Sequence, residues 1–323
     1  MSDDTREAWA FAADHVDTSD PAAERPAEAS PRDMVLTILG CGYSGRAIGE
    51  RLSRAGADVV GTTRDPGNKG EALRVRGIAP LAFGGEAPSD ALEARLSETT
   101  HLVVSIAPGE AGDPAIATHA EAIKRAPRLA WIGYLSTVGV YGDHDGAWVD
   151  EDAVTHPVSE RSRERVAAEN LWMTLALERG VPISLLRLSG IYGPGRNAFV
   201  SLHEGRARRL VKPGQVFNRI HRDDIAGATE HLATRLHNGI VNVTDDEPAP
   251  PQDVVEHAAR LMGVEPPPEQ DFATAELSPM ARSFYGETKR VSNARLKALG
   301  YAMRHPTYRE GLAALWDGGW REE

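Results

Sequence analysis

The sequence lacks the features that mark secreted and membrane proteins. It has one cysteine, Cys41, so no disulfide can form within the chain. No apolar run approaches the roughly 20 residues that cross a bilayer, and the first residues lack the basic start and apolar core of a secretory signal. A Gly-x-Ser-x-Gly elbow and a cysteine–histidine cluster are also missing. These absences predict a cytoplasmic protein without a membrane partner, in which Cys41 packs rather than reacts.

Positive charge is also scarce. The net charge is −11, and residues 1–33 carry −6 of it through nine acids and three arginines. This balance disfavours nucleic acid as a partner. Three prolines among alanines and acids predict that residues 1–33 form a disordered acidic extension. Residues 7–16 within it could form a short helix, and a docking role for that helix stays open beside a solvated tail.

The rest of the chain is organised around one glycine-rich turn. An apolar run of strand length, 34–39, stops at Gly40, and an amphipathic helical pattern follows the sequence Gly40-Cys-Gly42-Tyr43-Ser44-Gly45. In this strand–turn–helix context Gly40 permits the tight turn, Gly42 lets the backbone approach a pyrophosphate, and Gly45 lets the helix pack on the strand. The new helix would present its free amides to the phosphates. The pattern predicts a dinucleotide site that includes Tyr43 and Ser44.

Strand and helix patterns then alternate. Further strands are predicted at 57–61, 78–83, 101–106, 129–135, 183–187 and 240–243, with helices at 90–97, 160–179 and 251–262. The alternation predicts an α/β fold with a right-handed, doubly wound, Rossmann-type parallel sheet. We expect a nucleotide-binding domain over 34–180, and the remainder of the sheet with a smaller C-terminal substrate lobe over 181–323. Residues 190–196 are expected to form a loop.

Two strand ends supply further candidate cofactor contacts. The second strand leads into Thr62, Thr63 and Arg64, where an NAD-binding fold usually places an acid for the ribose 2′-hydroxyl. A cation suits a 2′-phosphate instead, so NADP is favoured over NAD, although Asp65 follows one position later. The fourth strand ends at Ala107, on the same edge of the sheet as the glycine turn.

Five segments together resemble an extended short-chain dehydrogenase/reductase of the NAD-dependent epimerase/dehydratase type. They are the glycine turn, Leu135-Ser-Thr-Val-Gly-Val-Tyr141-Gly, Arg187-Leu-Ser-Gly-Ile-Tyr192-Gly-Pro-Gly, Arg219-Ile-His221-Arg-Asp-Asp-Ile-Ala and Leu296-Lys-Ala-Leu-Gly-Tyr. The resemblance covers residues 34 to about 313 and implies the same fold, a homodimer and a small-molecule substrate. Val166, Leu171, Trp172 and Leu175 give helix 160–179 apolar surface for such a dimer.

The resemblance also implies a catalytic Ser/Thr, Tyr and Lys, with the lysine four residues after the tyrosine. Thr137 falls on the Ser/Thr position. Counting back from Glu169 places Arg161 at the tyrosine position and Arg165 at the lysine position. An arginine does not deprotonate in proteins, so Arg161 cannot act as acid or base, whereas Arg165 can still supply a cation to a ribose or a carboxylate. The chain therefore resembles atypical members that lack the tyrosine.

Other residues could replace the missing proton donor. Tyr141 is the first candidate, with the alternative that it packs under the cofactor; His144 and Tyr192 follow. A literal Tyr-x-x-x-Lys at Tyr285–Lys289 lies in the late lobe, where packing or a substrate loop is the plainer interpretation.

The candidate substrate residues are Tyr192, Arg196 and His221. His221 with Asp223 and Asp224 also has the composition of a metal site, but in this context Asp224 is expected to cap a helix or anchor a loop, so no metal is predicted.

These patterns predict an NAD(P)-dependent oxidoreductase or epimerase acting on a small polar or sugar-like substrate. The paired arginines favour a substrate with a carboxylate or phosphate. The alternatives are a non-catalytic NADP(H)-binding redox sensor, which the loss of the tyrosine favours, and an assembly subunit with a vestigial cofactor site. The retained Thr137 and the full C-terminal lobe favour the enzyme.

Overall fold

The structure is a computed structural model that describes residues 28–278 and 282–321. The possible docking helix at 7–16 and most of the acidic extension lie outside these residues. The described end of the extension begins with an ion pair from Glu28 to Arg235 and a hydrogen bond from the Ala29 amide to the Thr234 carbonyl. A short 3-10 helix, η1 (Pro31–Asp33), then leads into the first strand. Within the described ranges, no helix has both the length and the apolar character to cross a membrane.

A seven-stranded sheet confirms the predicted fold class. Its strand order is β11-β7-β5-β4-β1-β2-β3, and the pairs from β5 through to β3 are parallel. The order reverses direction at β1, as a doubly wound sheet requires. The strands are β1 (Val35–Leu39), β2 (Asp58–Thr63), β3 (Ala79–Ala82), β4 (His101–Val104), β5 (Trp131–Thr137), β7 (Ile183–Leu188) and β11 (Gly239–Val243).

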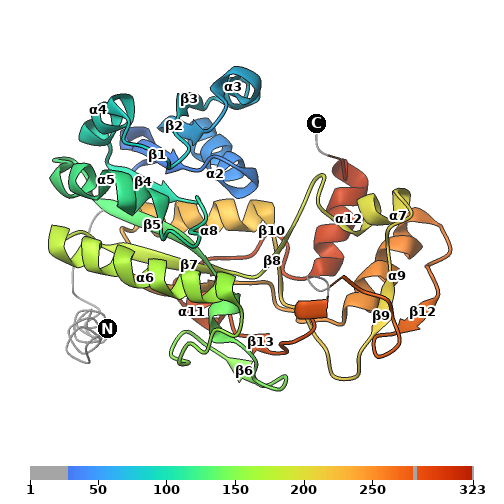
Figure 1. Ribbon diagram of the computed structural model, residues 1–323. Helices are drawn as coiled ribbons and strands as arrows, with labels where there is room; N and C mark the ends of the chain where they lie inside the picture. The colour runs from blue at the N-terminus through green and yellow to red at the C-terminus, as the bar shows by residue number, and fades with distance from the viewer. Residues whose placement is uncertain (1–27, 279–281, 322–323) are drawn as a thin grey trace. The chain divides into compact units, whose positions relative to one another are not determined.

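Helices cover both faces of the sheet (Figure 1). On one face, β1, β4, β5 and β7 share an apolar cluster with α4, α5 and α6, in which Leu39, Leu96, Ile132 and Trp172 are fully buried. On the other face, α2 packs closely on the sheet, and a Cβ at Gly49 would lie 2.6 Å from Ile78 Cδ1 and 3.1 Å from Ile38 Cδ1. The helices around the sheet are α2 (Tyr43–Arg54), α3 (Pro66–Arg74), α4 (Asp90–Glu98), α5 (Pro114–Arg125), α6 (Glu160–Arg179) and α8 (Arg222–Thr234).

The chain divides into two compact units. Unit 1 comprises the residues up to Ser136, Glu164–Leu186 and Thr229–Ile240; unit 2 comprises Thr137–Arg163, Arg187–Ala228 and the chain from Val241. The chain therefore passes between the units several times, whereas the sequence analysis divides it once, after residue 180.

Unit 2 is built from short elements around a small core. Helix α9 packs against α7, α12 and β9 (Figure 1), and its core includes Phe199, Tyr308 and Leu312. The expectation of a loop at 190–196 is wrong at its start, because β8 pairs with β10 in a two-stranded ladder. The elements are η2 (Val138–Tyr141), β6 (Trp148–Val149), β8 (Gly190–Tyr192), α7 (Ala198–His203), β9 (Arg209–Val211), β10 (Arg219–His221), α9 (Pro251–Met262), β12 (Glu269–Asp271), β13 (Arg290–Val291), α11 (Ala294–Ala298) and α12 (Tyr308–Gly318).

Candidate functional site

The glycine turn of unit 1 has three glycines in three different environments. Gly40 has φ +83°, and a Cβ there would lie 2.7 Å from the Ile106 amide nitrogen, so only glycine fits. A Cβ at Gly45 would lie 3.0 Å from the Gly40 carbonyl oxygen. A Cβ at Gly42, in contrast, would meet no described atom within 4 Å. The backbone at Gly42 is therefore open to an approaching group, as the sequence pattern predicts.

Helix α2 begins at Tyr43 directly after this open glycine. Its first turn contains no acid, and its N-cap Gly42 has no side chain with which to accept a hydrogen bond. The amides of Tyr43, Ser44 and Gly45 occupy the first turn, where a helix offers donors without intrahelical acceptors. This end of α2 can bind an anion such as a pyrophosphate.

Cys41 packs under the turn, as predicted. It is buried, and its burial raises the pKa of the thiol to about 12. A side chain at Gly61 of β2 would lie 2.6 Å from the Cys41 sulfur. The thiol fills the space between the turn and β2 and is protonated at neutral pH.

Three polar residues at the end of β2, Thr62, Arg64 and Asp65, have different roles. Thr62 is fully buried, and its hydroxyl oxygen accepts the Gly40 amide hydrogen at 2.8 Å, so this hydroxyl holds the glycine turn. Asp65 caps α3 by accepting the Asn68 amide, and this bond is the main cause that holds the pKa of its carboxyl below the usual range. Arg64 is exposed. The acid is thus occupied by the helix cap, and the cation faces solvent.

The segment after β4 is anchored by a buried acid. Ala107 is exposed, and a bridge between Gly109 and Gly112 closes the loop behind it. Asp113 then caps α5 through the Ala115 and Ile116 amides, while its other carboxylate oxygen accepts the Trp172 indole hydrogen at 2.9 Å. These bonds fix the position at which the exposed segment leaves the sheet.

Arg165 is held by the end of β5. Its Nη1 donates to the Tyr134 hydroxyl at 3.0 Å and to the Leu135 carbonyl at 2.9 Å, and its guanidinium carbon lies 5.5 Å from the Tyr134 ring centre. On the next turn of α6, the Glu169 carboxylate accepts a short hydrogen bond from Ser136. Two residues of α6 therefore fasten the helix to the carboxyl end of β5, on the residues that precede Thr137.

In unit 2, Tyr192 and His221 are buried and in contact. Their rings meet edge to face at 5.1 Å, and the Tyr192 hydroxyl lies where a side chain at Gly311 would clash with it. Burial raises the pKa of Tyr192 far above its usual range. Arg196, on the loop that continues from β8, is exposed. Tyr192 and His221 thus line the interior of unit 2, and Arg196 lies at its surface.

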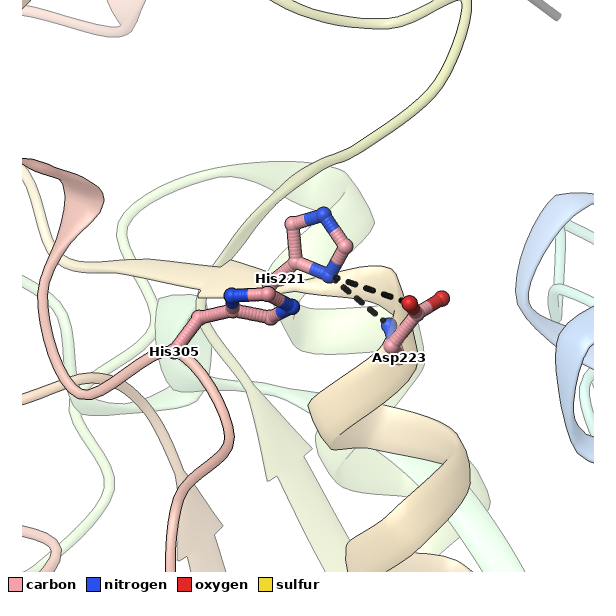
Figure 2. Close-up of side chains that lie close together, drawn as sticks. All are labelled: His221, Asp223 and His305. Atoms are coloured by element: carbon pink, nitrogen blue, oxygen red, sulfur yellow. Dashed lines mark hydrogen bonds and ion pairs between the residues drawn. The ribbon is translucent and has the colours of Figure 1, made fainter. Parts of the chain in front are cut away.

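A histidine that the sequence analysis missed joins His221. The rings of His221 and His305 lie 4.1 Å apart between centres, and Asp223 lies beside both (Figure 2). The backbone amides of Arg304 and His305 donate to the Asp224 carboxylate at 2.7 and 2.9 Å. Asp224 is therefore a loop anchor, one of the two roles expected for it.

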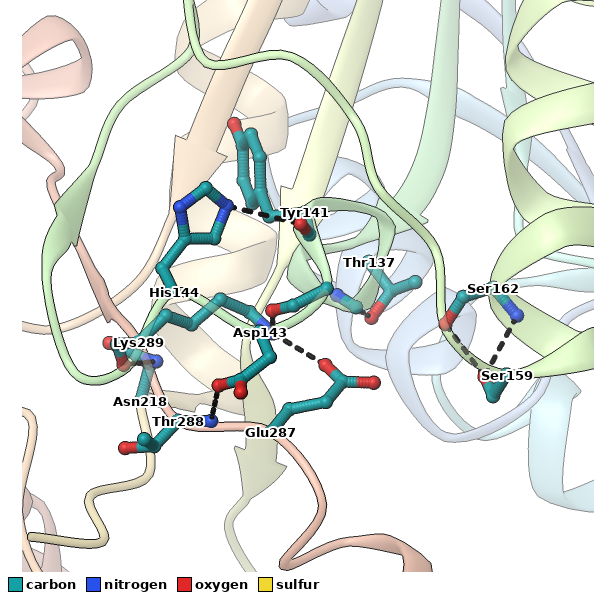
Figure 3. Close-up of polar contacts among 12 residues, drawn as sticks. Thr137, Tyr141, Asp143, His144, Ser159, Ser162, Asn218, Glu287, Thr288 and Lys289 are labelled. Carbon is teal, nitrogen blue, oxygen red and sulfur yellow. Dashed lines mark hydrogen bonds and ion pairs between the residues drawn. The ribbon is translucent and has the colours of Figure 1, made fainter.

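Thr137 and Ser162 organise the start of the unit 2 segment that follows β5. The Thr137 hydroxyl oxygen caps η2 by accepting the Gly139 amide at 3.1 Å, which leaves its hydrogen available to a second partner. Ser162 is buried, and its hydroxyl accepts a hydrogen bond from Ser159 (Figure 3). Arg161, the neighbour of Ser162, is exposed.

Tyr141 is fully buried. Its hydroxyl donates to the Asn242 side-chain oxygen at 2.7 Å, and the Arg187 guanidinium lies 4.9 Å from its ring centre. Burial raises its pKa. This environment is that of a packed tyrosine, the alternative left open beside a role as proton donor. His144 contacts the Tyr141 carbonyl through Nε2 at 3.1 Å (Figure 3).

Tyr285 and Lys289 have separate roles. Lys289 is buried and donates to the Gly142 carbonyl and to Glu287, both at 2.6 Å. The Thr288 amide donates to Asp143 at 2.7 Å, so residues 287–289 fasten the segment after η2 (Figure 3). Tyr285 stacks on Phe272 with ring centres 4.8 Å apart. Tyr285 therefore packs, as its plainer interpretation expects, while Lys289 fixes a backbone.

The predicted site residues divide cleanly between the units. All the predicted cofactor residues lie in unit 1, together with Arg165; Thr137, Tyr141, Arg161 and the predicted substrate residues lie in unit 2. Two residues of the candidate site are not predicted from the sequence: Tyr134, the partner of Arg165, and His305. The apolar pattern of β5 marks Tyr134 only as a strand residue, and no local pattern distinguishes His305.

Known proteins resemble the chain in sequence and in fold. A relative, Protein YeeZ of Escherichia coli (strain K12), is 31% identical over 250 residues, covering 72% of this chain and 85% of the relative. The structure of a functionally unknown conserved protein from Silicibacter pomeroyi DSS is 46% identical, with a TM-score of 0.79 over 88% of this chain and 98% of that one. UDP-glucuronic acid 4-epimerase from Bacillus cereus, solved in complex with NAD, shares the fold at 18% identity, with a TM-score of 0.68 over 87% and 97% of the two chains.

One family model accounts for most of the sheet and for the glycine turn. The model of the NAD dependent epimerase/dehydratase family matches residues 36–243, from β1 to the end of β11. Together with the relative from Escherichia coli, this match shows that the chain belongs to the NAD dependent epimerase/dehydratase family.

Proposed function

We propose that the protein is an NADP-dependent oxidoreductase or epimerase that acts on a small polar substrate bearing an anionic group. The observation that carries the proposal is the glycine turn. A Cβ at Gly40 or Gly45 would lie within 3.0 Å of backbone atoms, whereas a Cβ at Gly42 would meet no described atom within 4 Å. An open glycine before an uncapped helix suits the pyrophosphate of a dinucleotide. A structural neighbour was solved with NAD, which supports a nicotinamide dinucleotide here.

The preference for NADP rests on the division of roles after β2. Asp65 is occupied by the Asn68 amide and is therefore a poor partner for a ribose 2′-hydroxyl. Arg64 is exposed, and a side chain at Gly84 would lie 3.1 Å from its Cγ, so glycine there leaves room for the arginine stem. A guanidinium suits a 2′-phosphate better than a hydroxyl. Thr63 is the remaining hydroxyl at this strand end, since Thr62 holds the turn.

The proposed active site is atypical because two arginines replace a tyrosine and a lysine. Arg165 keeps the cationic role of the lysine, and Tyr134 and Leu135 orient it through Nη1. Its Nε and Nη2 make no hydrogen bond to the described residues and can donate to a ribose or a carboxylate. Arg161 supplies a second, exposed guanidinium one helical turn earlier. Two such cations favour a substrate with a carboxylate or phosphate, as in a sugar nucleotide.

Proton transfer then has to proceed without a tyrosine. Tyr141 is buried against Asn242, and we assign it a packing role. Thr137 keeps its hydroxyl hydrogen available while its oxygen accepts the Gly139 amide, so it can donate to a substrate oxygen. We assign Thr137 the orientation of the substrate oxygen and solvent the supply of the proton, since an arginine does not release one at physiological pH.

We also propose a homodimer through α5 and α6. Trp172 and Leu175 were expected to contribute to that surface, but both are buried in the core of unit 1. The exposed large apolar residues of α6 are Leu171 and Leu177, at 46% and 49% exposure. Light scattering tests the dimer: the chain should have twice its monomer mass at micromolar concentration, and Leu171→Glu with Leu177→Glu should return it to a monomer.

Cofactor binding is the first test of the proposed function. Titration of the full chain with NADPH and with NADH should show tighter binding of NADPH, and Arg64→Ala should lower the NADPH to NADH affinity ratio by about tenfold or more, as expected for a charge-assisted contact. Lys69→Ala is the matched control, because Lys69 is an exposed cation on the neighbouring helix α3. An unchanged ratio in Arg64→Ala would refute the NADP assignment.

Turnover is the second test. Oxidation of NADPH is followed against a panel of carbonyl compounds and nucleotide sugars, with and without a carboxylate or phosphate. We expect turnover for an anionic member of the panel, and a higher KM for it in Arg161→Gln. Tight NADPH binding without turnover on any substrate, together with activity in an Arg161→Tyr variant, would instead identify the protein as a redox sensor.

A further inference from the structure

The side chains of His221, Asp223 and His305 meet inside unit 2 although they come from two distant segments. His221 ends β10, Asp223 lies in the first turn of α8, and His305 lies in the segment before α12. One potential ligand atom from each residue lies within 4.8 Å of the others. In Figure 2 a ring nitrogen of His305 points towards His221 and Asp223. Two imidazoles and a carboxylate thus converge on one point.

One hydrogen bond determines which nitrogen of the His221 ring carries the proton. Its Nδ1 accepts the Asp223 amide hydrogen at 3.1 Å, so Nδ1 carries a lone pair and not a proton. The same Nδ1 lies 3.9 Å from an Asp223 carboxylate oxygen. A cation bound at Nδ1 would take the place of the Asp223 amide hydrogen on that lone pair, with the Asp223 carboxylate beside it.

The His305 ring is also available as a ligand. It is 6% exposed, and its Nε2 is buried without a hydrogen-bond partner among the described residues. A buried nitrogen without a partner is costly unless a ligand occupies it.

We propose that His221, Asp223 and His305 bind a divalent zinc ion. Two imidazole nitrogens and one carboxylate oxygen are a donor set that zinc uses, and three protein ligands leave a fourth position open. This inference rests on unit 2 alone and is independent of the proposed cofactor and substrate.

The geometry requires a small closure on binding. Donors around a tetrahedral zinc lie about 3.4 Å apart, given ligand bonds of about 2.1 Å. Asp223 can supply the movement, because its side chain is 35% exposed and it lies at the start of a helix. The backbone of His305 is fixed by Asp224, which keeps its ring beside His221.

Two neighbouring cations set the expected affinity. Arg222 Nε and Arg304 Nη1 each lie 3.8 Å from an Asp223 carboxylate oxygen. Both guanidinium groups attract the carboxylate and repel an incoming dication. We therefore expect these cations to weaken zinc binding, and tighter binding when Arg304, whose side chain is 68% exposed, is replaced. Bound zinc would join the β10–α8 junction to the segment that leads into α12.

The experiment uses the full chain, stripped with a chelator and free of NAD(P). Zinc chloride is titrated in competition with a chromophoric chelator, and Tm is measured with and without zinc. We expect one zinc per chain and a Tm higher by a few degrees at saturation. His305→Gln and Asp223→Asn should each weaken binding by at least tenfold. His231→Gln, a change to another histidine of α8, should bind zinc like the wild type.

Cobalt provides a second readout that does not depend on the stability of any variant. Co²⁺ bound by the wild type should show the visible absorption of a tetrahedral nitrogen–oxygen site, displaced by one equivalent of zinc. Arg304→Gln should tighten zinc binding several-fold. The inference is overturned if the wild type binds zinc no better than His305→Gln, or if Arg304→Gln leaves the affinity unchanged while Asp223→Asn also binds like the wild type.

Discussion

Unit 1 and unit 2 hold their candidate residues by different means. In unit 1 the critical groups are glycines, helix-end amides and strand carbonyls, as at Gly40, Gly42 and Leu135. In unit 2 they are buried side chains that bond to segments far away in sequence, as in the Tyr141–Asn242 and Lys289–Gly142 hydrogen bonds. A backbone site has a local sequence pattern, whereas a site built of buried side chains depends on which segments meet. The first kind depends on glycine at a few positions, and the second depends on each buried side chain.

The largest effect should come from the glycine turn, where two substitutions separate folding from binding. Gly40→Ala places a Cβ 2.7 Å from the Ile106 backbone at a φ of +83°, and we expect a loss of several kcal/mol in unfolding free energy. Gly42→Ala meets no described atom and should unfold within about 0.5 kcal/mol of the wild type. The same Gly42→Ala should weaken NADPH binding by at least tenfold, because its Cβ enters the space proposed for the pyrophosphate.

Denaturant unfolding and NADPH titration of both variants check this prediction. Arg54→Ala, at an exposed residue in the last turn of α2, serves as a control for a substitution in this helix away from the glycine turn. Gly42→Ala that binds NADPH like the wild type would show that the open glycine does not face the cofactor.

Asp245 in unit 2 should give the next largest effect. The residue is 1% exposed, and burial raises the pKa of its carboxyl to about 8 from 3.8. Because the folded pKa is raised, its contribution to stability is complete below pH 3.8 and is lost as the pH rises towards 8. Asp245→Asn keeps an acceptor for the Glu247 amide and should raise the unfolding free energy at pH 7 by up to about 4 kcal/mol.

Urea unfolding of the wild type and of Asp245→Asn at pH 4, 6 and 8 tests this. The two curves should converge at pH 4 and separate as the pH rises. Glu265→Gln, at an exposed acid, should follow the wild type throughout. A constant difference between wild type and Asp245→Asn across this range would show that the carboxyl is ionised in the folded protein.

The contrast between the units also explains which elements of the fold could be predicted from the sequence. Helices 160–179 and 251–262 agree with α6 and α9, because long amphipathic patterns with clear ends determine a helix locally. Helix α5 is absent from the helices predicted from the sequence, although Asp113 is a typical N-cap and Pro114 a typical first-turn residue. The sequence does not predict the pairing of β8 with β10 or of β6 with β13, because strands of two or three residues form only where a distant partner pairs with them.

The candidate site shows the same limit. The turn at Gly40, Gly42 and Gly45 could be predicted from the glycine spacing between a strand and a helix, and the place of Arg165 from the family resemblance and its distance to Glu169; their roles towards a cofactor stay predictions. The occupation of Asp65 by the Asn68 amide, which matters for the choice of cofactor, requires the start of α3. His305 reaches His221 only because Asp224 accepts two amides from a segment 80 residues later, at Arg304, and 81 residues later, at His305. No sequence period records such a contact.

His101 should give unit 1 a pH response opposite to that of Asp245. It is 3% exposed, and burial lowers its pKa to about 4 from 6.5. Its contribution to stability is complete above pH 6.5 and is lost as the pH falls towards 4, about 3 kcal/mol in all. His101→Phe should remove that part of the acid sensitivity. The measurement is the slope of unfolding free energy between pH 6.5 and 4, with His203→Gln at an exposed histidine as control.

Tyr141→Phe should give the smallest effect on stability. The change removes the hydroxyl that donates to Asn242 at 2.7 Å and leaves the Asn242 oxygen buried, since that residue is 0% exposed. The loss of a buried hydrogen bond of this kind costs roughly 1–2 kcal/mol. The ring remains, so its contact with Arg187 and its packing are kept. NADPH affinity should be unchanged.

The same variant decides between the two roles of Tyr141. If the tyrosine only packs, kcat should stay within about twofold of the wild type and the pH profile should keep its shape. If it donates the proton, kcat should fall by about 100-fold or more, which is the usual contribution of a general acid. Asn242→Asp sharpens the comparison, because a carboxylate beside the hydroxyl would raise the pKa of Tyr141 further. A catalytic tyrosine would then shift the pH profile upward, whereas a packed one would alter stability alone.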